Sequence, residues 1–242
     1  MKRALIVVDV QNEHVRGELA ITHPSVHESM PNIAMAMDTA ADLQVPTVVV
    51  CRVERPGSPH FAQDQPCSAI HSLIADNPRD ATVITSGAAG DGEGDLAAWL
   101  RDRDVTVATL VGYTAEGAIS RLATLLTASG LTVEVLEDST GSHEQESDDL
   151  DARAVYERAL DRLEHQESVI VGTAMDWEEA VREDRLVKRV RVGTAAENER
   201  PSRLRDEFER IEDRVRSLAE EGAATSEAFQ LQHTFAVGVQ PL

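Results

Sequence analysis

Short apolar runs alternate with helical patterns along most of the chain. Six runs rich in β-branched residues are bounded by turn signals, at 3–10, 46–53, 81–86, 106–112, 131–138 and 168–173. Nearly continuous apolar runs of this kind are typical of strands that are covered on both faces. The segments between them show helical periodicity, at 26–45, 95–105, 118–130, 151–167 and 176–184.

This alternation predicts an α/β protein, with a mostly parallel sheet between two layers of helices. We expect this three-layer α/β/α sandwich to occupy residues 1–185. In such sheets, ligands bind outside the carboxyl ends of the strands. That edge of the predicted sheet brings together Asp9, residues 53–60, Thr85, Ser86 and the turn at 112–117.

Residues 186–242 differ in composition and predict a C-terminal extension. It would contain an edge strand from "LVKRVRVG", a polar linker, a charged helix at 202–222 and a terminal strand. The helix repeats apolar residues at intervals of four and three, a heptad-like pattern that needs a partner surface. We expect it either to pack on its own domain or to join copies of the chain.

The charge of the chain is strongly negative, at −20 from 43 acidic and 23 basic residues. A field of this sign disfavours binding to nucleic acid or to anionic membrane surfaces. Lysine occurs only at Lys2 and Lys188, and an acidic, lysine-poor chain indicates adaptation to a salt-loaded cytoplasm. No apolar run is long enough for a signal peptide or a membrane span, so we expect a soluble, cytoplasmic protein. The acidic composition adds the expectation that it is halophilic.

The stretch "LVGYTAEGAISRLATLLTASG", residues 110–130, predicts a buried strand, a tight turn and a helix. A turn at the start of a helix is where an α/β enzyme presents a nucleophile, because the helix dipole favours an anion there. The helix is predicted to begin at Ala118, which carries no reactive atom. On the turn, Glu116 would either complement the helix dipole or project into a pocket beside Asp9.

Asp9 ends the first predicted strand, in "VVDVQNEH". Its carboxylate would either act at the mouth of the sheet edge or cap the turn that Gln11 and Asn12 close. The residues leave both interpretations open.

Several motifs, in unbroken order over roughly residues 3–183, resemble the isochorismatase-like cysteine hydrolases. "ALIVVDVQNEHVRGEL" resembles the opening signature of that superfamily, and "RPGSPHFAQ" resembles the loop after its second strand. "DLAAWLRDRDV", "LVGYTAEGAISRLATLLTASGLTVEVLEDST" and "ALDRLEHQESVIVGTAMDW" resemble later segments. The resemblance implies a hydrolase fold in which an aspartate, a cysteine and a lysine surround one electrophilic carbon.

Carried onto this chain, the resemblance assigns the aspartate to Asp9 and the turn beside it to Gln11 and Asn12. A cis peptide bond is expected at Thr114-Ala115. We expect the turn residues Tyr113, Thr114, Ala115, Glu116 and Gly117 to line the site.

Two of the three catalytic positions do not match the superfamily. Ala118 stands where the resemblance places the cysteine, and Thr85 or Ser86 stands where it places the lysine. No alignment restores the lysine, because no lysine lies between Lys2 and Lys188. Cys51 and Cys67 are expected outside the nucleophile turn, and they form no disulfide framework.

These absences predict a pseudoenzyme, retained as a non-catalytic binding or assembly subunit. The alternative is a divergent hydrolase of an amide or vinyl ether, using Asp9 with His14 and His60 or with a metal. We expect no cofactor and no metal site, and a homodimer or homotetramer that binds a small molecule or a protein partner.

Overall fold

The computed structural model describes residues 1–75, 81–87, 92–144 and 151–189. The predicted linker, charged helix and terminal strand of the C-terminal extension lie outside these residues. The described elements, in chain order, are β1 (Arg3–Val8), α1 (Asn12–Arg16), α2 (Val26–Asp42), β2 (Thr47–Val53), η1 (Pro66–Ser68), α3 (Ser72–Ala75), β3 (Thr82–Gly87), α4 (Gly92–Arg101), β4 (Val107–Tyr113), η2 (Ala115–Ile119), α5 (Ser120–Ala128), β5 (Thr132–Gly141), α6 (Ala152–Glu164), β6 (Val169–Gly172) and α7 (Ala174–Arg182).

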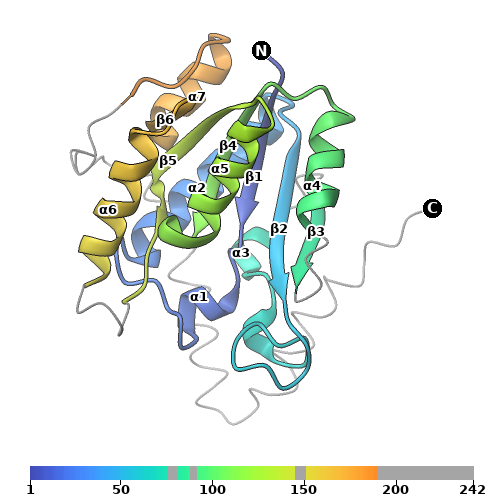
Figure 1. Ribbon diagram of the computed structural model, residues 1–242, viewed down its shortest axis with the longest axis vertical. Coiled ribbons are helices and arrows are strands. Elements are labelled where there is room, and N and C mark those ends of the chain that lie inside the picture. The colour runs from blue at the N-terminus through green and yellow to red at the C-terminus, as the bar shows by residue number, and fades with distance from the viewer. Residues whose placement is uncertain (76–80, 88–91, 145–150, 190–242) are drawn as a thin grey trace.

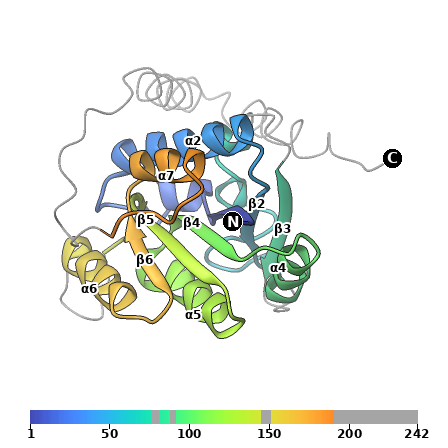
Figure 2. The same ribbon diagram turned by 90° about the horizontal axis from the view of Figure 1, so that it is seen from above.

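The described strands form one six-stranded sheet in the order β3-β2-β1-β4-β5-β6, and every neighbouring pair is parallel (Figure 1). Helices α2 and α7 cover one face, and α4, α5 and α6 cover the other (Figure 2). Each face has its own cluster of buried apolar side chains. The predicted three-layer α/β/α sandwich is therefore confirmed. In the described residues, no helix is long and apolar enough to cross a membrane.

The inner strands form where the apolar runs predict them because their side chains are buried on both faces, whereas most residues of the edge strand β3 are exposed or half-buried and do not match that expectation. All six residues of β1 and all seven of β4 are buried. The helices begin at residues that satisfy free backbone N–H groups. Ser25 and Glu28 form a capping box at α2, and the Asp151 carboxylate accepts a hydrogen bond from the Ala154 N–H at α6.

Of the edge strand expected at 186–193, the described residues 186–189 are not part of the sheet, and the remaining residues lie outside the described part of the chain. The Val187 N–H donates to the Glu134 carboxylate and the Lys188 N–H donates to Asp176, so these donors are used by side chains. The short helices α1 and α3 were not predicted, because four or five residues are too few to show helical periodicity.

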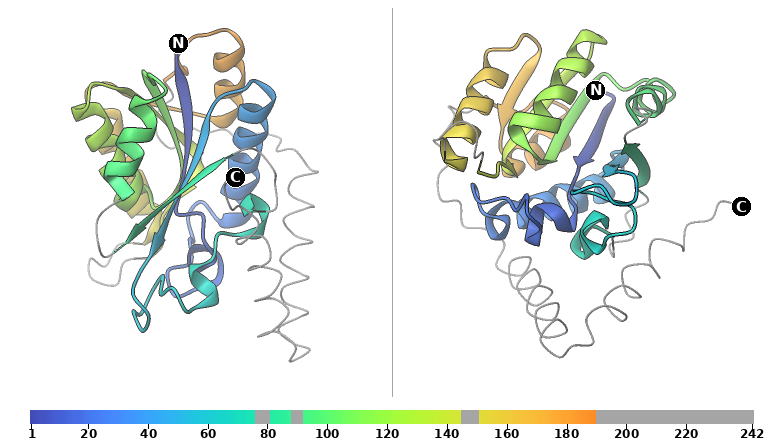
Figure 3. Two further views of the ribbon diagram at one scale, coloured as in Figure 1. Left: turned by 90° about the vertical axis from the view of Figure 1, so that its right-hand side faces the viewer. Right: turned by 60° about the horizontal axis from the view of Figure 1, so that its bottom comes forward.

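The carboxyl ends of the strands meet at one end of the molecule, where α1, α3 and the loop after β2 also lie (Figure 3). The sheet order places β1 at its centre, between β2 and β4. The residues that follow β1 and β4 therefore lie at the middle of this edge, where ligands bind in sheets of this type.

Candidate functional site

A small cavity at this edge brings together the three positions that the sequence singled out. Asp9, Ser86 and Ala118 line it, with buried apolar side chains from β1, β2, α4 and α5 around them. The space inside it that a water molecule can occupy is about 10 Å³, which is room for about one water, and the value rises to about 280 Å³ only when all space between atoms and the open solvent at the mouth is counted. Thr85 does not line this cavity, because neighbouring residues of a strand face opposite sides of the sheet.

Asp9 lies at the end of β1 in a left-handed backbone conformation, with φ of 49°. Its N–H donates to the Val50 carbonyl on β2, and its own carbonyl accepts a hydrogen bond from the Gln11 N–H. Aspartate adopts this conformation more readily than most residues. The backbone of Asp9 is thus held from both sides at the cavity.

The Asp9 carboxyl is buried, with only 8% of the residue exposed. Its Oδ1 has no hydrogen-bond partner among the described residues. Burial raises the pKa of Asp9 to about 7, although the charges of Arg52 and Arg121 oppose the shift. At neutral pH the group is therefore divided between a carboxylate and a neutral acid, and it can both accept and donate a hydrogen bond.

The turn between β4 and α5 differs from its prediction in two details. The cis peptide bond joins Tyr113 and Thr114, one residue before the expected position. The helical backbone begins at Ala115 as a single π-type turn, in which the Ile119 N–H donates to the Thr114 carbonyl at 3.0 Å. Turns of this kind are frequent at functional sites, and the local sequence carries no simple signal for them.

Two glycines allow this edge to pack closely. Gly112 has φ of 109°, and a Cβ there would lie 2.1 Å from the Val8 carbonyl oxygen of β1. A Cβ on Gly92 would lie 2.7 Å from the Ser86 Cβ. Because Gly92 has no side chain, α4 begins directly against Ser86.

Two charged residues of the cavity have no signal in the sequence pattern. Arg121 on α5 and Glu93 on α4 line it and form an ion pair with each other. Their side chains are 56% and 40% exposed, so the pair lies on the solvent side of the buried cavity floor. Arg121 follows Ala118 by three residues, and helical periodicity therefore places the two on the same face of the helix.

Other predicted site residues have structural partners. Gln11 is fully buried, and its side chain bonds to the backbone of Arg52 and Ser68. The Asn12 Nδ2 donates to the Pro66 carbonyl. These two amides attach the end of β1 to the loop after β2. The Tyr113 hydroxyl bonds to Ser29 at 2.7 Å, and burial raises its pKa.

The two candidate histidines do not line the Asp9 cavity. His14 is buried against the rings of Phe61 and Tyr113, and its Nδ1 bonds to the Leu19 carbonyl. Burial lowers the pKa of His14 to about 4, so the ring is neutral at pH 7. His60 instead pairs with Glu13, at 3.3 Å between Nδ1 and Oε1.

The end of β2 and the loop that follows it show no arrangement of metal ligands among the described residues. Arg52 and Glu54 pair with each other there, and among the described residues no three potential ligands form a cluster. The carboxylate of Glu116 accepts a hydrogen bond from the Ser142 hydroxyl and does not line the Asp9 cavity.

The fold defines an α/β protein with a six-stranded parallel sheet between two layers of helices, and its sheet edge carries Asp9, Ser86 and Ala118 at one cavity. Residues 3–177 match the family model described as the isochorismatase domain. The chain belongs to the isochorismatase family.

Solved structures agree with this family. A crystal structure named as an isochorismatase, from Burkholderia xenovorans LB400, is 29% identical, with a TM-score of 0.71 over 88% of this chain and 98% of that one. A cysteine hydrolase from Pseudomonas syringae pv. phaseolicola 1448A shares the fold, with 17% identity and a TM-score of 0.67 over 75% of this chain and 93% of that one. An N-carbamoylsarcosine amidase from Thermoplasma acidophilum also shares it, with 20% identity and a TM-score of 0.58 over 72% of this chain and 97% of that one. No protein of curated function matches the sequence.

Proposed function

We propose that this chain is a non-catalytic isochorismatase-family protein that binds a small polar molecule in the Asp9 cavity. The observation that carries the proposal is the composition of that cavity, where Asp9 and Ser86 meet Ala118 and none of the described lining residues carries a thiol. Without a thiol, the acyl-thioester intermediate of a cysteine hydrolase cannot form. The expected homo-oligomer, protein partner and cytoplasmic location belong to the same proposal.

Neither cysteine of the chain replaces the missing nucleophile. Cys51 is buried in β2, its thiol donates to the Ile84 carbonyl, and burial raises its pKa to about 12. Cys67 lies in η1, where burial also raises its pKa. Since the thiolate is the reactive form, both thiols are poor nucleophiles near neutral pH.

Binding is favoured by the groups that remain. The Oδ1 of Asp9 has no partner among the described residues, and a buried polar atom without a hydrogen bond is costly. A ligand that hydrogen-bonds to this atom would remove that cost. Arg121 at the mouth suits a ligand whose other end carries a carbonyl or carboxylate oxygen.

The direct test is hydrolysis of small amides and vinyl ethers. We expect the wild-type protein to show no turnover above that of Asp9→Asn. Treatment with iodoacetamide, which alkylates thiols, is expected to leave this background rate unchanged. Turnover in the wild type that Asp9→Asn abolishes would contradict the proposal. Binding is measured separately, by calorimetry with the same amides as probes.

A second function is favoured by the pKa of Asp9. A carboxylate with a pKa near 7 is suited to act as a general base toward water, and hydrolysis could then proceed without a thiol. Because His14 and His60 do not line the cavity, this divergent hydrolase would depend on Asp9 alone. Its signature is a rate that rises with pH around 7 and disappears in Asp9→Asn.

We expect Arg121 to supply the cationic influence that the missing lysine would exert. The thiol introduced by Ala118→Cys would lie one helical turn from the guanidinium, and a nearby positive charge lowers a thiol pKa. Removing the charge, in Ala118→Cys with Arg121→Gln, is expected to raise that pKa by about one unit. The measurement is the pH dependence of alkylation, in a Cys67→Ser background.

The matched control for this prediction is Arg182→Gln, on α7 across the sheet. It is expected to leave the pKa of the introduced thiol unchanged. Equal effects of Arg121→Gln and Arg182→Gln would show that Arg121 does not serve the site.

A further inference from the structure

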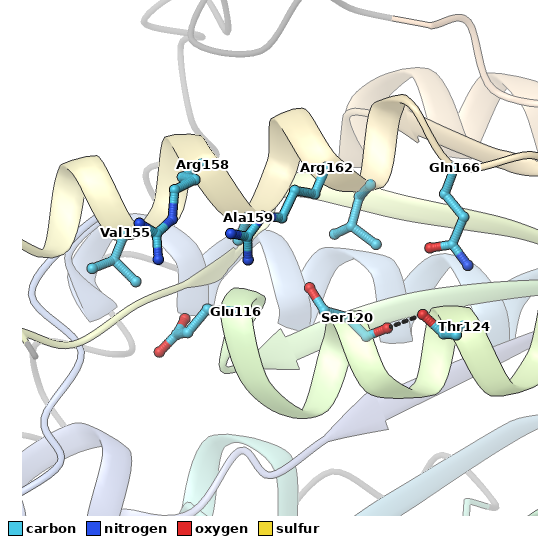
Figure 4. A pocket seen from close by; sticks show the side chains of 9 residues that line it. Glu116, Ser120, Thr124, Val155, Arg158, Ala159, Arg162 and Gln166 are labelled. Carbon is cyan, nitrogen blue, oxygen red and sulfur yellow. Dashed lines mark hydrogen bonds between the residues drawn. The ribbon is translucent and has the colours of Figure 1, made fainter. Parts of the chain in front are cut away.

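We propose that the groove between α5 and α6 is a second binding site, for a small anion that also carries hydroxyl groups. The groove lies outside the Asp9 cavity and shares no lining residue with it. The space in it that water-sized molecules can occupy is about 190 Å³. Figure 4 shows Arg158 and Arg162 extending from α6 over the groove toward α5.

The distribution of charge on α6 favours an anion. Arg158 and Arg162 are one helical turn apart and both line the groove, whereas the acidic residues of α6 do not. Of these, Glu157 pairs with Arg153 and Asp161 with His165. Two guanidinium groups at this spacing on one wall can both donate hydrogen bonds to a single anion between them. In a chain of net charge −20, such a placement is a local exception.

The α5 wall of the groove favours hydroxyl groups. The Ser120 hydroxyl donates to the Ala115 carbonyl, and the Thr124 hydroxyl donates to the Ser120 carbonyl (Figure 4). Their protons are therefore used, and their oxygens remain able to accept hydrogen bonds from a ligand. The arginines of α6 would therefore donate hydrogen bonds to the anionic group of a ligand, and the hydroxyl oxygens of α5 would accept hydrogen bonds from its hydroxyl groups.

The groove also has an apolar base and polar ends. Val155, Ala159 and Leu163 line it from α6, Glu116 lies at one end and Gln166 at the other. Glu116 is an acceptor that would repel a second anionic group. These features fit a molecule of a few carbons with one anionic end and one or more hydroxyls, such as a polyol phosphate or a hydroxy acid.

The test is calorimetry on the full chain with three probes of equal carbon number: glycerol 3-phosphate, glycerate and glycerol. At constant ionic strength of roughly 0.15 M, we expect at least one of the two anions to bind saturably and glycerol not to bind. The tighter-binding probe shows whether the groove prefers a phosphate or a carboxylate as the anionic group. Absence of saturable binding by both anions would overturn the proposal.

Substitutions then test at which site the anion binds. Arg162→Gln is expected to weaken binding about tenfold, the size of effect expected for a charged hydrogen bond. Arg162 is exposed, so the variant should fold normally. Thr124→Val is expected to weaken glycerol 3-phosphate more than inorganic phosphate. If Arg121→Gln abolishes binding and Arg162→Gln does not, the anion lies in the Asp9 cavity and the groove proposal is wrong.

Discussion

At pH 7 and above, Asp9→Asn is expected to be more stable than the wild type by up to about 4 kcal/mol. The reason is that burial raises the pKa of Asp9 from 3.8 to about 7 in the folded protein. Asparagine has a similar shape to the neutral acid and does not ionise. The substitution therefore removes the cost of burying a carboxylate.

The sign of this effect follows from where each state releases its proton. Below about pH 4 the carboxyl is protonated in both states, and ionisation does not distinguish Asp9→Asn from the wild type. Between about pH 4 and pH 7 the unfolded chain ionises while the folded chain stays protonated, so the stability of the wild type falls as pH rises. Above about pH 7 the difference is constant.

The charged and titratable groups that influence Asp9 are Arg52 and Cys51 from β2 and Arg121 from α5, whose partner on α4 is Glu93. Arg52 and Arg121 stay charged across the window, and the Cys51 thiol stays protonated. The titration in this range is therefore assigned to Asp9 itself.

The measurement is the free energy of unfolding in urea from pH 3.5 to pH 8, for the wild type, Asp9→Asn and Asp64→Asn. Asp64 is an exposed aspartate of the loop after β2 and serves as the control. A stability difference between Asp9→Asn and the wild type that does not change with pH would contradict the prediction. A natural protein that keeps such a costly carboxyl at a cavity is expected to use it.

Replacing Glu134 with leucine is expected to lower the free energy of unfolding by about 3–5 kcal/mol. Glu134 is fully buried and binds the nearly buried Arg3 through two hydrogen bonds, of 3.0 and 2.9 Å. Its carboxylate also accepts hydrogen bonds from the Thr109 hydroxyl and the Val187 N–H. The substitution would leave Arg3 buried without its partner.

The double variant Arg3→Met with Glu134→Leu is expected to recover most of the lost stability, because the buried charge is then removed together with its partner. The control is Glu178→Leu, which breaks an exposed pair with Arg182 and should cost less than about 1 kcal/mol. Chemical unfolding of the four proteins measures these differences. A double variant as unstable as Glu134→Leu alone would show that the carboxylate acts mainly through Thr109 and Val187.

The parts of the site that the sequence predicted are those with a local signal. Asp9 follows a continuous apolar run, and such a run ends where a parallel strand reaches the sheet edge. Ala118 was located by the glycine-rich turn between a buried strand and a periodic helix. The structure brings both residues to one cavity.

The missed parts depend on distance in space. Thr85 and Ser86 were indistinguishable as positions, and only the facing of β3 places Ser86 in the cavity. Glu93 and Arg121 lie on different helices, and their pairing across the cavity has no counterpart in the order of residues. His14 was a candidate ligand, but its packing against Phe61 and Tyr113 makes it a buried neutral ring.

By itself the sequence determined the α/β class, the family and the lack of any lysine between Lys2 and Lys188, because these depend on periodicity, on the order of motifs and on which residues are present. The tertiary structure decided which groups face the cavity and what their environment does to them. The pKa of Asp9 depends on burial by segments remote in the chain, and the pairing of Arg3 with Glu134 spans 131 positions. Desolvation and long-range pairing depend on contacts between segments that are far apart in the sequence, so no local sequence pattern predicts them.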